Sequence, residues 1–106
     1  MGDRVNRGEV WLAEVGRKRR PVLVLTRNEV LDVRALVTVA EITTSPRGLA
    51  AEVEIDHGSV GLQRESFVNC DGLHTVAQSR LTERVGDVDD DTLRRVCSAI
   101  SYALGC

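Results

Sequence analysis

The chain has 106 residues, of which 42% are hydrophobic and 28% are charged, and its formal net charge is −2. This length and core content fit one domain, so we expect a single domain over residues 1–106. With three aromatic residues and no net positive charge, the chain lacks both the stacking surface of an RNA-binding sheet and a bulk attraction for nucleic acid. A nucleic-acid site would have to be a local patch.

The cysteines indicate a reducing compartment. Cys70, Cys97 and Cys106 are odd in number and irregularly spaced, and no CxxC pair occurs. The sequence begins without a signal-peptide pattern, and no apolar stretch approaches the length of a membrane span. Because disulfides are rare in the cytosol, these features predict a cytoplasmic protein with free thiols and no integral membrane role.

The first half of the chain predicts three strands. Residues 9–14 form the first and lie between two glycines, and residues 20–26 and 35–42 form the next two. The second of these contains four consecutive apolar residues, Val22 to Leu25, so both of its faces must be covered. It is therefore expected in the middle of a sheet and not at an edge.

Two shorter segments follow these strands. Residues 28–32 are expected to make one helical turn capped by Asn28. Residues 51–55 alternate strictly between apolar and acidic residues, which predicts a half-exposed strand with its glutamates in water. Gly58 and Gly61 then indicate a loop.

The third quarter of the chain predicts a hairpin. Residues 66–70 and 74–77 have the composition of two short strands, and Asp71-Gly72 between them is typical of a tight turn. In this interpretation Asp71 has a purely structural role, which has to be weighed against any catalytic one.

The C-terminal segment predicts an amphipathic helix. Asp89 or Asp90 can cap its N-terminus, and Gly105 stands where a C-terminal cap is expected. One stripe is apolar and is expected to pack on the sheet, while Arg94, Arg95 and two serines take the other face. The stripe consists of Leu93, Val96, Cys97, Ile100 and Leu104.

These elements together predict the fold class. Five to seven short strands followed by one helix indicate a mainly β protein, because so short a chain must curl its sheet to cover both faces. We expect a small SH3-like barrel, or strongly bent antiparallel sheet, with a C-terminal α-helix.

Polar clusters flank the two buried strands. Arg20, the last of four consecutive cations, opens one strand, and Thr43, Thr44 and Ser45 follow the other. A guanidinium and hydroxyls that meet at one end of a sheet form an anion site on a rigid scaffold. An isolated charge run is more often a solvated loop, so sequence pattern alone favours that interpretation for Arg17 to Arg20.

Five sequence blocks, in this order, resemble the MazF/PemK family of toxin endoribonucleases, which have the CcdB/PemK-like fold. The blocks are Arg7-Gly8-Glu9-Val10-Trp11, Arg20 to Leu25, Ile42-Thr43-Thr44, Val68-Asn69-Cys70-Asp71 with Thr75, and Arg80-Leu81. The resemblance implies a homodimer that cleaves single-stranded RNA at short sequences without metal, and an antitoxin that neutralises it. His57 and His74 stand far apart without a metal-ligand spacing, so we expect no cofactor.

The resemblance also implies roles for individual residues. Metal-independent cleavage uses the 2′-hydroxyl as nucleophile and leaves a 2′,3′-cyclic phosphate and a 5′-hydroxyl. Arg20 matches the family's catalytic arginine, and its planar fork suits phosphate. Thr43 matches the catalytic threonine, whose hydroxyl can donate to the phosphate. Asp71 stands where some members place an acidic residue proposed as general base, although an ordinary aspartate is a weak base at neutral pH.

Three features depart from the family pattern. Asn69 stands where a relative has a basic residue that acts as acid, and an amide cannot supply a proton usefully. His74 stands where many members have arginine; it is a candidate acid or base, although a lone strand histidine is more often structural. The connection at residues 16–19 is shorter than the mobile loop of many members, which favours a fixed row of phosphate contacts.

The expected RNA contacts are the remaining cations and polar residues near these strands. They are Arg17, Lys18, Arg19, Thr26, Arg27, Asn28, Thr44, Ser45, Arg47 and Asn69. A cationic, partly apolar groove would also bind an acidic disordered tail, so we expect the C-terminal segment of the antitoxin to lie over Arg20 and Thr43.

Two other classes compete with this hypothesis. A CcdB-like toxin of the same fold inhibits DNA gyrase by protein contact and needs no active site, but the tryptophan-containing C-terminal patch of that class is missing, since the only tryptophan is Trp11. A non-catalytic SH3-like adaptor would present an aromatic groove, for which three aromatic residues are too few.

Overall fold

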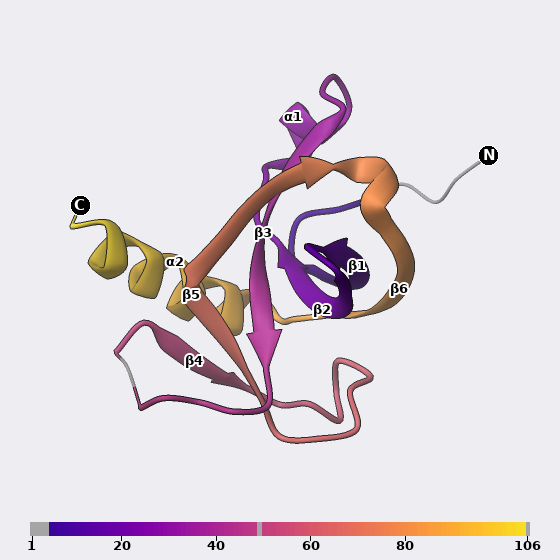
Figure 1. The fold of residues 1–106 in the computed structure, drawn as a ribbon. Helices are drawn as coiled ribbons and strands as arrows, with labels where there is room; N and C mark the ends of the chain where they lie inside the picture. The colour runs from indigo at the N-terminus through magenta and orange to yellow at the C-terminus, as the bar shows by residue number, and fades with distance from the viewer. Residues whose placement is uncertain (1–4, 49, 106) are drawn as a thin grey trace.

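The computed structural model describes residues 5–48 and 50–105. Figure 1 shows its elements along the chain. They are β1 (Glu9–Val15), β2 (Lys18–Val24), α1 (Asn28–Leu31), β3 (Leu36–Thr43), β4 (Glu52–Ile55), β5 (Ser66–Ala77), the 3-10 turn η1 (Gln78–Arg80), β6 (Leu81–Asp87) and α2 (Asp90–Leu104).

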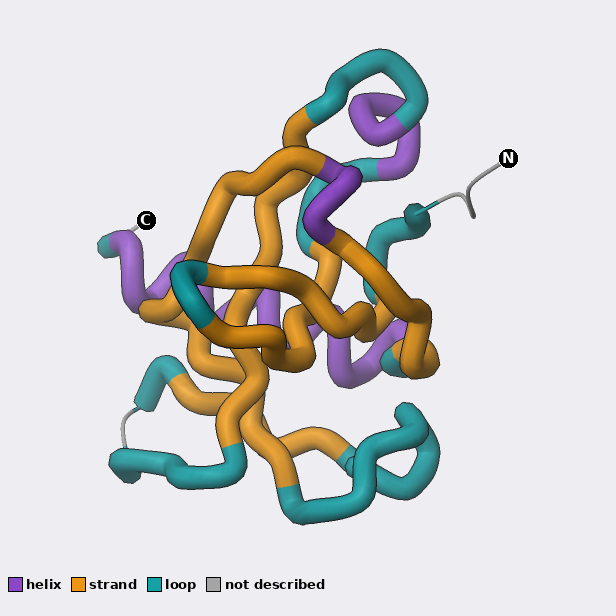
Figure 2. The backbone as a smooth tube through the Cα atoms, turned by 45° about the vertical axis from the view of Figure 1, so that its right-hand side comes forward, coloured by secondary structure: helices purple, strands orange, loops and turns teal. Residues whose placement is uncertain are grey.

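The strands form one antiparallel sheet in the order β4-β5-β3-β2-β1-β6. β5 lies near one edge and β6 forms the other edge, yet only η1 separates them in the chain. The sheet must therefore curl until its two sides approach each other, as the tube in Figure 2 shows. This confirms the expected bent antiparallel sheet with a C-terminal helix.

β2 lies inside the sheet and is covered on both faces, as its apolar run predicts. Leu23 belongs to a cluster with Val10, Ala40 and Val96, beneath α2 and β4. Val22 belongs to a second cluster on the opposite face, inside the curl, which includes Trp11, Val24 and Val39. Val22, Leu23 and Val24 are fully buried, so the strand is held from both sides.

β5 differs from the predicted hairpin. Residues 66–77 form one long strand, and Asp71-Gly72 makes no turn. Ala40 of β3 pairs with Leu73, but the next residue, Glu41, pairs with Asn69. The residues between these partners are accommodated as a bulge, which bends β5 while the ladder continues on both sides. The prediction was wrong because a turn and a bulge use the same residue types.

The helices agree with the predictions except for one cap and for Cys97 and Leu104 of the predicted apolar stripe, which are exposed. In α2 the Asp89 side chain accepts from the Thr92 amide at 2.8 Å, and Gly105 adopts the left-handed conformation with φ 76°. In α1 the N-cap residue is Arg27, not Asn28, and it makes no side-chain cap hydrogen bond. Asn28 Oδ1 instead accepts from the Arg7 amide at 2.7 Å, because tertiary contact outcompetes the local cap.

β6 was not among the strands predicted, since Thr82, Glu83 and Arg84 interrupt any apolar pattern. It is positioned by pairing with β1 and by a close approach to the loop at residues 56–62. A Cβ at Gly86 would lie 2.3 Å from the carbonyl oxygen of Val60, so only glycine allows this contact. The loop therefore sits firmly against β6.

The remaining expectations concern membrane-spanning segments and the cysteines. No helix in the described ranges is long and apolar enough to cross a membrane. Cys70 is buried and Cys97 is exposed, and both are free thiols; Cys106 lies outside the described residues. Burial, with a smaller effect of nearby Asp71, raises the pKa of Cys70 to about 11, so this thiol stays protonated at neutral pH.

Candidate active site

Arg20 and Thr43 lie at the same end of the sheet. Val22 of β2 pairs with Glu41 of β3 in antiparallel register. Arg20 stands two residues before Val22, and Thr43 stands two residues after Glu41, so the register carries both toward one end. Both line an open groove of about 670 Å³. The predicted meeting of a guanidinium with strand-end hydroxyls is therefore present.

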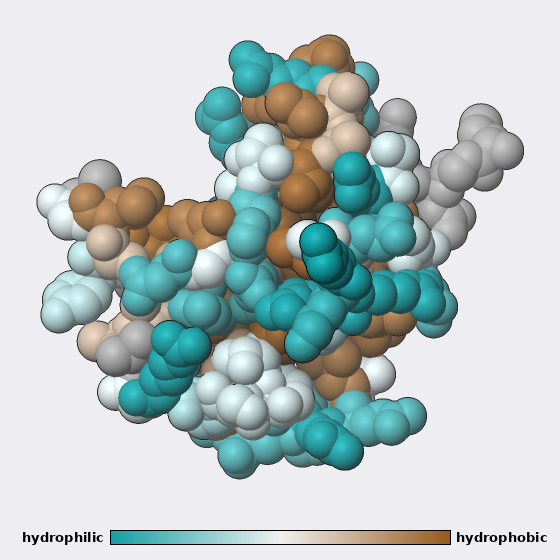
Figure 3. All heavy atoms as spheres, viewed as in Figure 1, coloured by the Kyte–Doolittle hydropathy of each residue, from teal (hydrophilic) through white to brown (hydrophobic). Residues whose placement is uncertain are grey.

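The groove is strongly cationic although the whole chain is slightly acidic. It carries five cationic side chains against one carboxylate, Glu83. The cations are Lys18, Arg19, Arg20, Arg64 and Arg84. Thr44, Gln63 and Ser66 add polar groups, and Leu12, Pro21 and Leu62 add apolar surface. In Figure 3 hydrophilic side chains gather in the region of β2 and the β1–β2 connection. Such a local field attracts a polyanion.

The Thr43 hydroxyl is oriented by the chain that follows it. The Ser45 amide donates to Thr43 Oγ1 at 3.0 Å. Because this bond uses an acceptor site of the oxygen, the hydroxyl proton is still available as a donor. Thr43 can therefore donate a hydrogen bond to an anion in the groove.

Arg20 is held from behind by a carboxylate. Its Nη1 donates to Glu41 Oε1. Its Nε is buried and has no hydrogen-bond partner within the described residues. Buried donors are normally satisfied, so this unpaired N–H is unusual. The side chain as a whole is 37% exposed, so its terminal Nη2 group, and not the buried Nε, can donate to an incoming ligand.

Glu41 joins Arg20 to His74. Its Oε2 lies 2.6 Å from His74 Nε2, and its side chain is only 20% exposed. Burial alone would raise the pKa of Glu41, but the hydrogen bonds from His74 and Arg20 outweigh burial and lower it. Glu41 is therefore ionised at neutral pH. We call Arg20, Glu41 and His74 the Glu41 cluster.

The β5 bulge closes this cluster on one side. A Cβ at Gly72 would lie 2.9 Å from Asn69 Nδ2 and 3.2 Å from Glu41 Oε2, so Gly72 leaves room for both side chains. Asn69 Oδ1 accepts from the Asp71 amide at 3.1 Å. The Asp71 side chain is exposed. The bulge thus places Asn69 beside Glu41, while Asp71 faces solvent.

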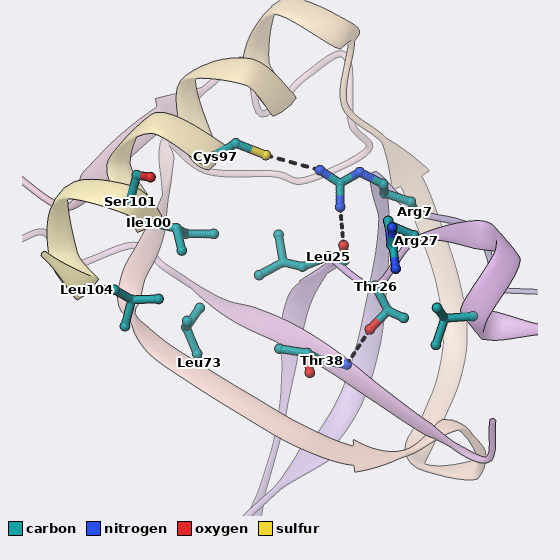
Figure 4. A pocket seen from close by; sticks show the side chains of 11 residues that line it. Arg7, Leu25, Thr26, Arg27, Thr38, Leu73, Cys97, Ile100, Ser101 and Leu104 are labelled. Atoms are coloured by element: carbon teal, nitrogen blue, oxygen red, sulfur yellow. Dashed lines mark hydrogen bonds between the residues drawn. The ribbon is translucent and has the colours of Figure 1, made fainter. Parts of the chain in front are cut away.

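Two of the expected RNA contacts line a different cavity. Thr26 and Arg27 border a space of about 470 Å³ between α2 and strands β3 and β5 (Figure 4). Arg7 lies there too, and it donates to the Leu25 carbonyl oxygen and, at 3.1 Å, to Cys97 Sγ. The Thr26 hydroxyl accepts from the Thr38 amide at 2.8 Å. These residues do not meet Arg20 and Thr43.

Lys18, Arg19 and Thr44 line the groove as expected, whereas Arg17, Asn28, Ser45 and Arg47 line neither space. Arg17 is exposed in the β1–β2 connection, and Asn28 is bonded to Arg7. Ser45 and Arg47 are exposed after β3. The Arg47 amide donates to the Glu52 carboxylate at 2.9 and 3.0 Å, so Glu52 is half-buried and not simply solvated.

Several residues of the site were not predicted from the sequence. Glu41 had a signal, because it is the only charged residue in the otherwise apolar run of β3. Arg64 and Arg84 had none, since they come from a loop and from an unpredicted strand. The Arg84 Nε donates to buried Glu9 at 2.8 Å, which fixes this guanidinium at the groove. The described residues contain no group of three or more metal-ligating side chains.

Comparison with known proteins agrees with this geometry. Residues 6–104 match the family model of PemK-like, MazF-like toxins of type II toxin-antitoxin systems. A probable endoribonuclease MazF5 of Mycobacterium tuberculosis is 41% identical, over 94% of this chain and 93% of its own.

Two solved structures are similar to the whole fold. The M. tuberculosis toxin MazF-mt6 gives a TM-score of 0.85 at 36% identity, covering 92% of this chain and 96% of that one. An endoribonuclease from a mycobacterial species, solved with its cognate antitoxin, gives a TM-score of 0.86 at 27% identity and covers 95% of each chain. With the family model matched almost from end to end, this chain belongs to the PemK-like, MazF-like toxins of type II toxin-antitoxin systems.

Proposed function

We propose that this toxin is a metal-independent endoribonuclease that cleaves single-stranded RNA at short sequences. The observation that carries the proposal is the convergence of Arg20 and Thr43 in one cationic groove. In the reaction O2′ attacks the adjacent phosphorus, the bond from phosphorus to O5′ breaks, and O5′ takes up a proton. The products carry a 2′,3′-cyclic phosphate and a 5′-hydroxyl.

The chain's residues suit this chemistry. Charge accumulates on the non-bridging oxygens as phosphorus becomes five-coordinate, and preorganised donors stabilise it. Arg20 offers a planar guanidinium fixed by Glu41, and Thr43 offers its hydroxyl proton. Lys18 and Arg19 extend the cationic surface along the RNA backbone. His74 and Asp71 are the candidates for proton transfer.

Cleavage should depend on the 2′-hydroxyl. A mixed RNA incubated with the purified protein in EDTA is expected to give discrete fragments with cyclic phosphate and 5′-hydroxyl ends. A 2′-deoxy nucleotide at the cleavage position removes the nucleophile and should abolish cutting there. End-group mapping by mass spectrometry checks both. Cutting of the deoxy substrate at the normal rate would exclude this mechanism.

The same RNA-cleavage experiment distinguishes the proposed endoribonuclease from the alternative, a CcdB-like toxin. A CcdB-like toxin would leave RNA intact and inhibit DNA gyrase by contact. The cationic groove and the family of the chain do not favour that function. RNA that stays intact together with inhibition of gyrase supercoiling would reverse this conclusion.

We also propose a cytoplasmic homodimer whose RNA groove crosses both subunits. Tyr102 and Leu104 near the end of α2 are 71% and 64% exposed, and hydrophobic atoms gather there in Figure 3. Exposed apolar residues next to an apolar cavity are typical of an interaction surface. Sedimentation at micromolar concentration is expected to give twice the chain mass. A monomer that cleaves RNA at full rate would contradict the proposal.

The partner we propose is an antitoxin with an acidic C-terminal segment over Arg20 and Thr43. A mycobacterial endoribonuclease of this fold has been solved with its cognate antitoxin. Acidic side chains complement the five cations of the groove. RNA and antitoxin should therefore compete.

Charge reversal tests this competition. Arg17→Glu with Arg19→Glu should weaken both ligands, and the loss of antitoxin binding should shrink as salt rises, because exposed charges are screened. Calorimetry with free and RNA-saturated toxin measures the competition. Equal antitoxin affinity in the two cases, or a hydrogen-exchange footprint that misses residues 17–28 and 43–48, would overturn this binding mode.

A further inference from the structure

The Glu41 cluster has a feature that phosphate binding alone does not require. One carboxylate contacts two partners, because Oε1 accepts from Arg20 and Oε2 lies 2.6 Å from His74 Nε2. The three side chains come from three adjacent strands, β2, β3 and β5. Arg20 lines the groove, while Glu41 is mostly buried behind it. The cluster thus connects the phosphate-binding cation to a residue that can transfer a proton.

Resting on the proposed RNA cleavage, we propose that Glu41 is a positioning residue that orients His74 as the general base and fixes Arg20 for the same phosphate. Glu41 occupies Nε2 of the imidazole, which leaves Nδ1 free. In this step Nδ1 takes the proton of the 2′-hydroxyl while O2′ forms its bond to phosphorus. The bond from phosphorus to O5′ breaks, water protonates O5′, and the hydroxide so formed takes the proton back from the His74 imidazolium.

The arrangement resembles a catalytic triad, in which a carboxylate orients a histidine and the histidine deprotonates a nucleophile. A buried carboxylate on one ring nitrogen selects the tautomer that leaves the other nitrogen as acceptor, and it stabilises the imidazolium that forms. Histidine is the side chain that ordinarily titrates near neutral pH, whereas an exposed aspartate is a weak base there. His74 is 36% exposed, so it is accessible from solvent. Asp71 makes no such contact with Glu41 in the described structure.

The charged groups around His74 determine how a pH dependence of the cleavage rate is interpreted. Glu41 faces it from β3, Arg20 is joined to Glu41 from β2, and Asp71 stands three residues earlier on β5. Glu41 is ionised across the neutral range because its pKa is lowered. A change in rate near neutral pH therefore does not report Glu41, and the His74→Gln variant tests whether it depends on the imidazole.

The decisive substitution is Glu41→Gln. Glutamine has nearly the same shape, but it offers one acceptor oxygen and one NH2 donor. With the oxygen bonded to Arg20, the NH2 group faces His74 Nε2 and disfavours the tautomer that carries a proton there. Cleavage of a fixed oligonucleotide is expected to slow by about tenfold or more, mainly in kcat. The slope of log kcat against pH near neutral pH should differ between this variant and the wild type. Glu54→Gln removes an exposed carboxylate of β4 and serves as the matched control with unchanged rate.

A double-mutant cycle distinguishes positioning from general electrostatics. His74→Gln is expected to slow cleavage by roughly a hundredfold and to remove the neutral pH dependence. Adding Glu41→Gln to His74→Gln should then cost less than about threefold, because the two residues act as a unit. Fully additive losses would mean that Glu41 acts only through Arg20, which would overturn the proposed role.

Nitrogen NMR of the imidazole tests the geometry without any activity. The wild-type protein is expected to show His74 protonated at Nε2 and unprotonated at Nδ1 at mildly alkaline pH, and Glu41→Gln should lose this preference. Thermal unfolding checks that each variant is folded. If the wild type leaves RNA intact, the proposed function fails and this inference with it. If the wild type cleaves RNA and Glu41→Gln cleaves equally fast, only the inference fails.

Discussion

Arg20→Ala should lower the rate of RNA cleavage by roughly a hundredfold or more, because it removes the preorganised guanidinium from the phosphate site. Its loss also leaves the Glu41 carboxylate, which lies mostly buried behind the groove, without its guanidinium partner. Arg20→Lys should recover part of the rate, since it restores the charge but not the planar fork. Single-turnover kinetics on a fixed oligonucleotide measure these effects.

Thr43→Ala is expected to cost less than Arg20→Ala, because a neutral hydroxyl stabilises charge less than a guanidinium does. Arg94→Ala is the control, since Arg94 lies exposed on the outer face of α2 and pairs only weakly with Asp91, at 3.7 Å. If Arg20→Ala and Thr43→Ala are both folded and cleave at the wild-type rate, the groove is not the active site.

Leu23→Ala should lower the free energy of unfolding by about 2–5 kcal/mol, the usual range for a buried leucine. Leu23 is fully buried in the central strand, beneath α2 and β4, and its loss leaves a cavity that a sheet bonded on both sides cannot close. For a chain of this size, the melting temperature should fall by at least about 10 °C.

Leu36→Ala is the matched control, because Leu36 is 54% exposed at the start of β3. It should cost less than about 1 kcal/mol. Chemical denaturation of both variants gives the comparison. Equal destabilisation by Leu36→Ala and Leu23→Ala would show that the strand order does not place Leu23 in the core.

Local pattern was enough for much of the fold. Four consecutive apolar residues predicted that β2 is buried on both faces, and Val22, Leu23 and Val24 are fully buried. The caps of α2, Asp89 and Gly105, were predicted because each acts within a few residues of its own position. The turn at Asp71-Gly72 was wrong, because pairing with β3 decides whether such a sequence turns or bulges.

The residues of the candidate site were likewise predicted only in part from the sequence. Arg20 and Thr43 were predicted from their own sequence blocks, and strand register brings them to one end of the sheet. Thr26 and Arg27 were expected in the same site, but the curl of the sheet places them in the cavity beside α2.

By itself, therefore, the sequence determined the central strands and the caps of α2, because these depend on neighbours a few residues away, and it singled out Arg20 and Thr43 through their resemblance to the family pattern. Only the tertiary structure decided that Arg84 enters the groove and that Glu41 joins Arg20 to His74. Both depend on pairing between strands far apart in the chain, and a β ladder fixes that pairing only when the whole sheet has formed.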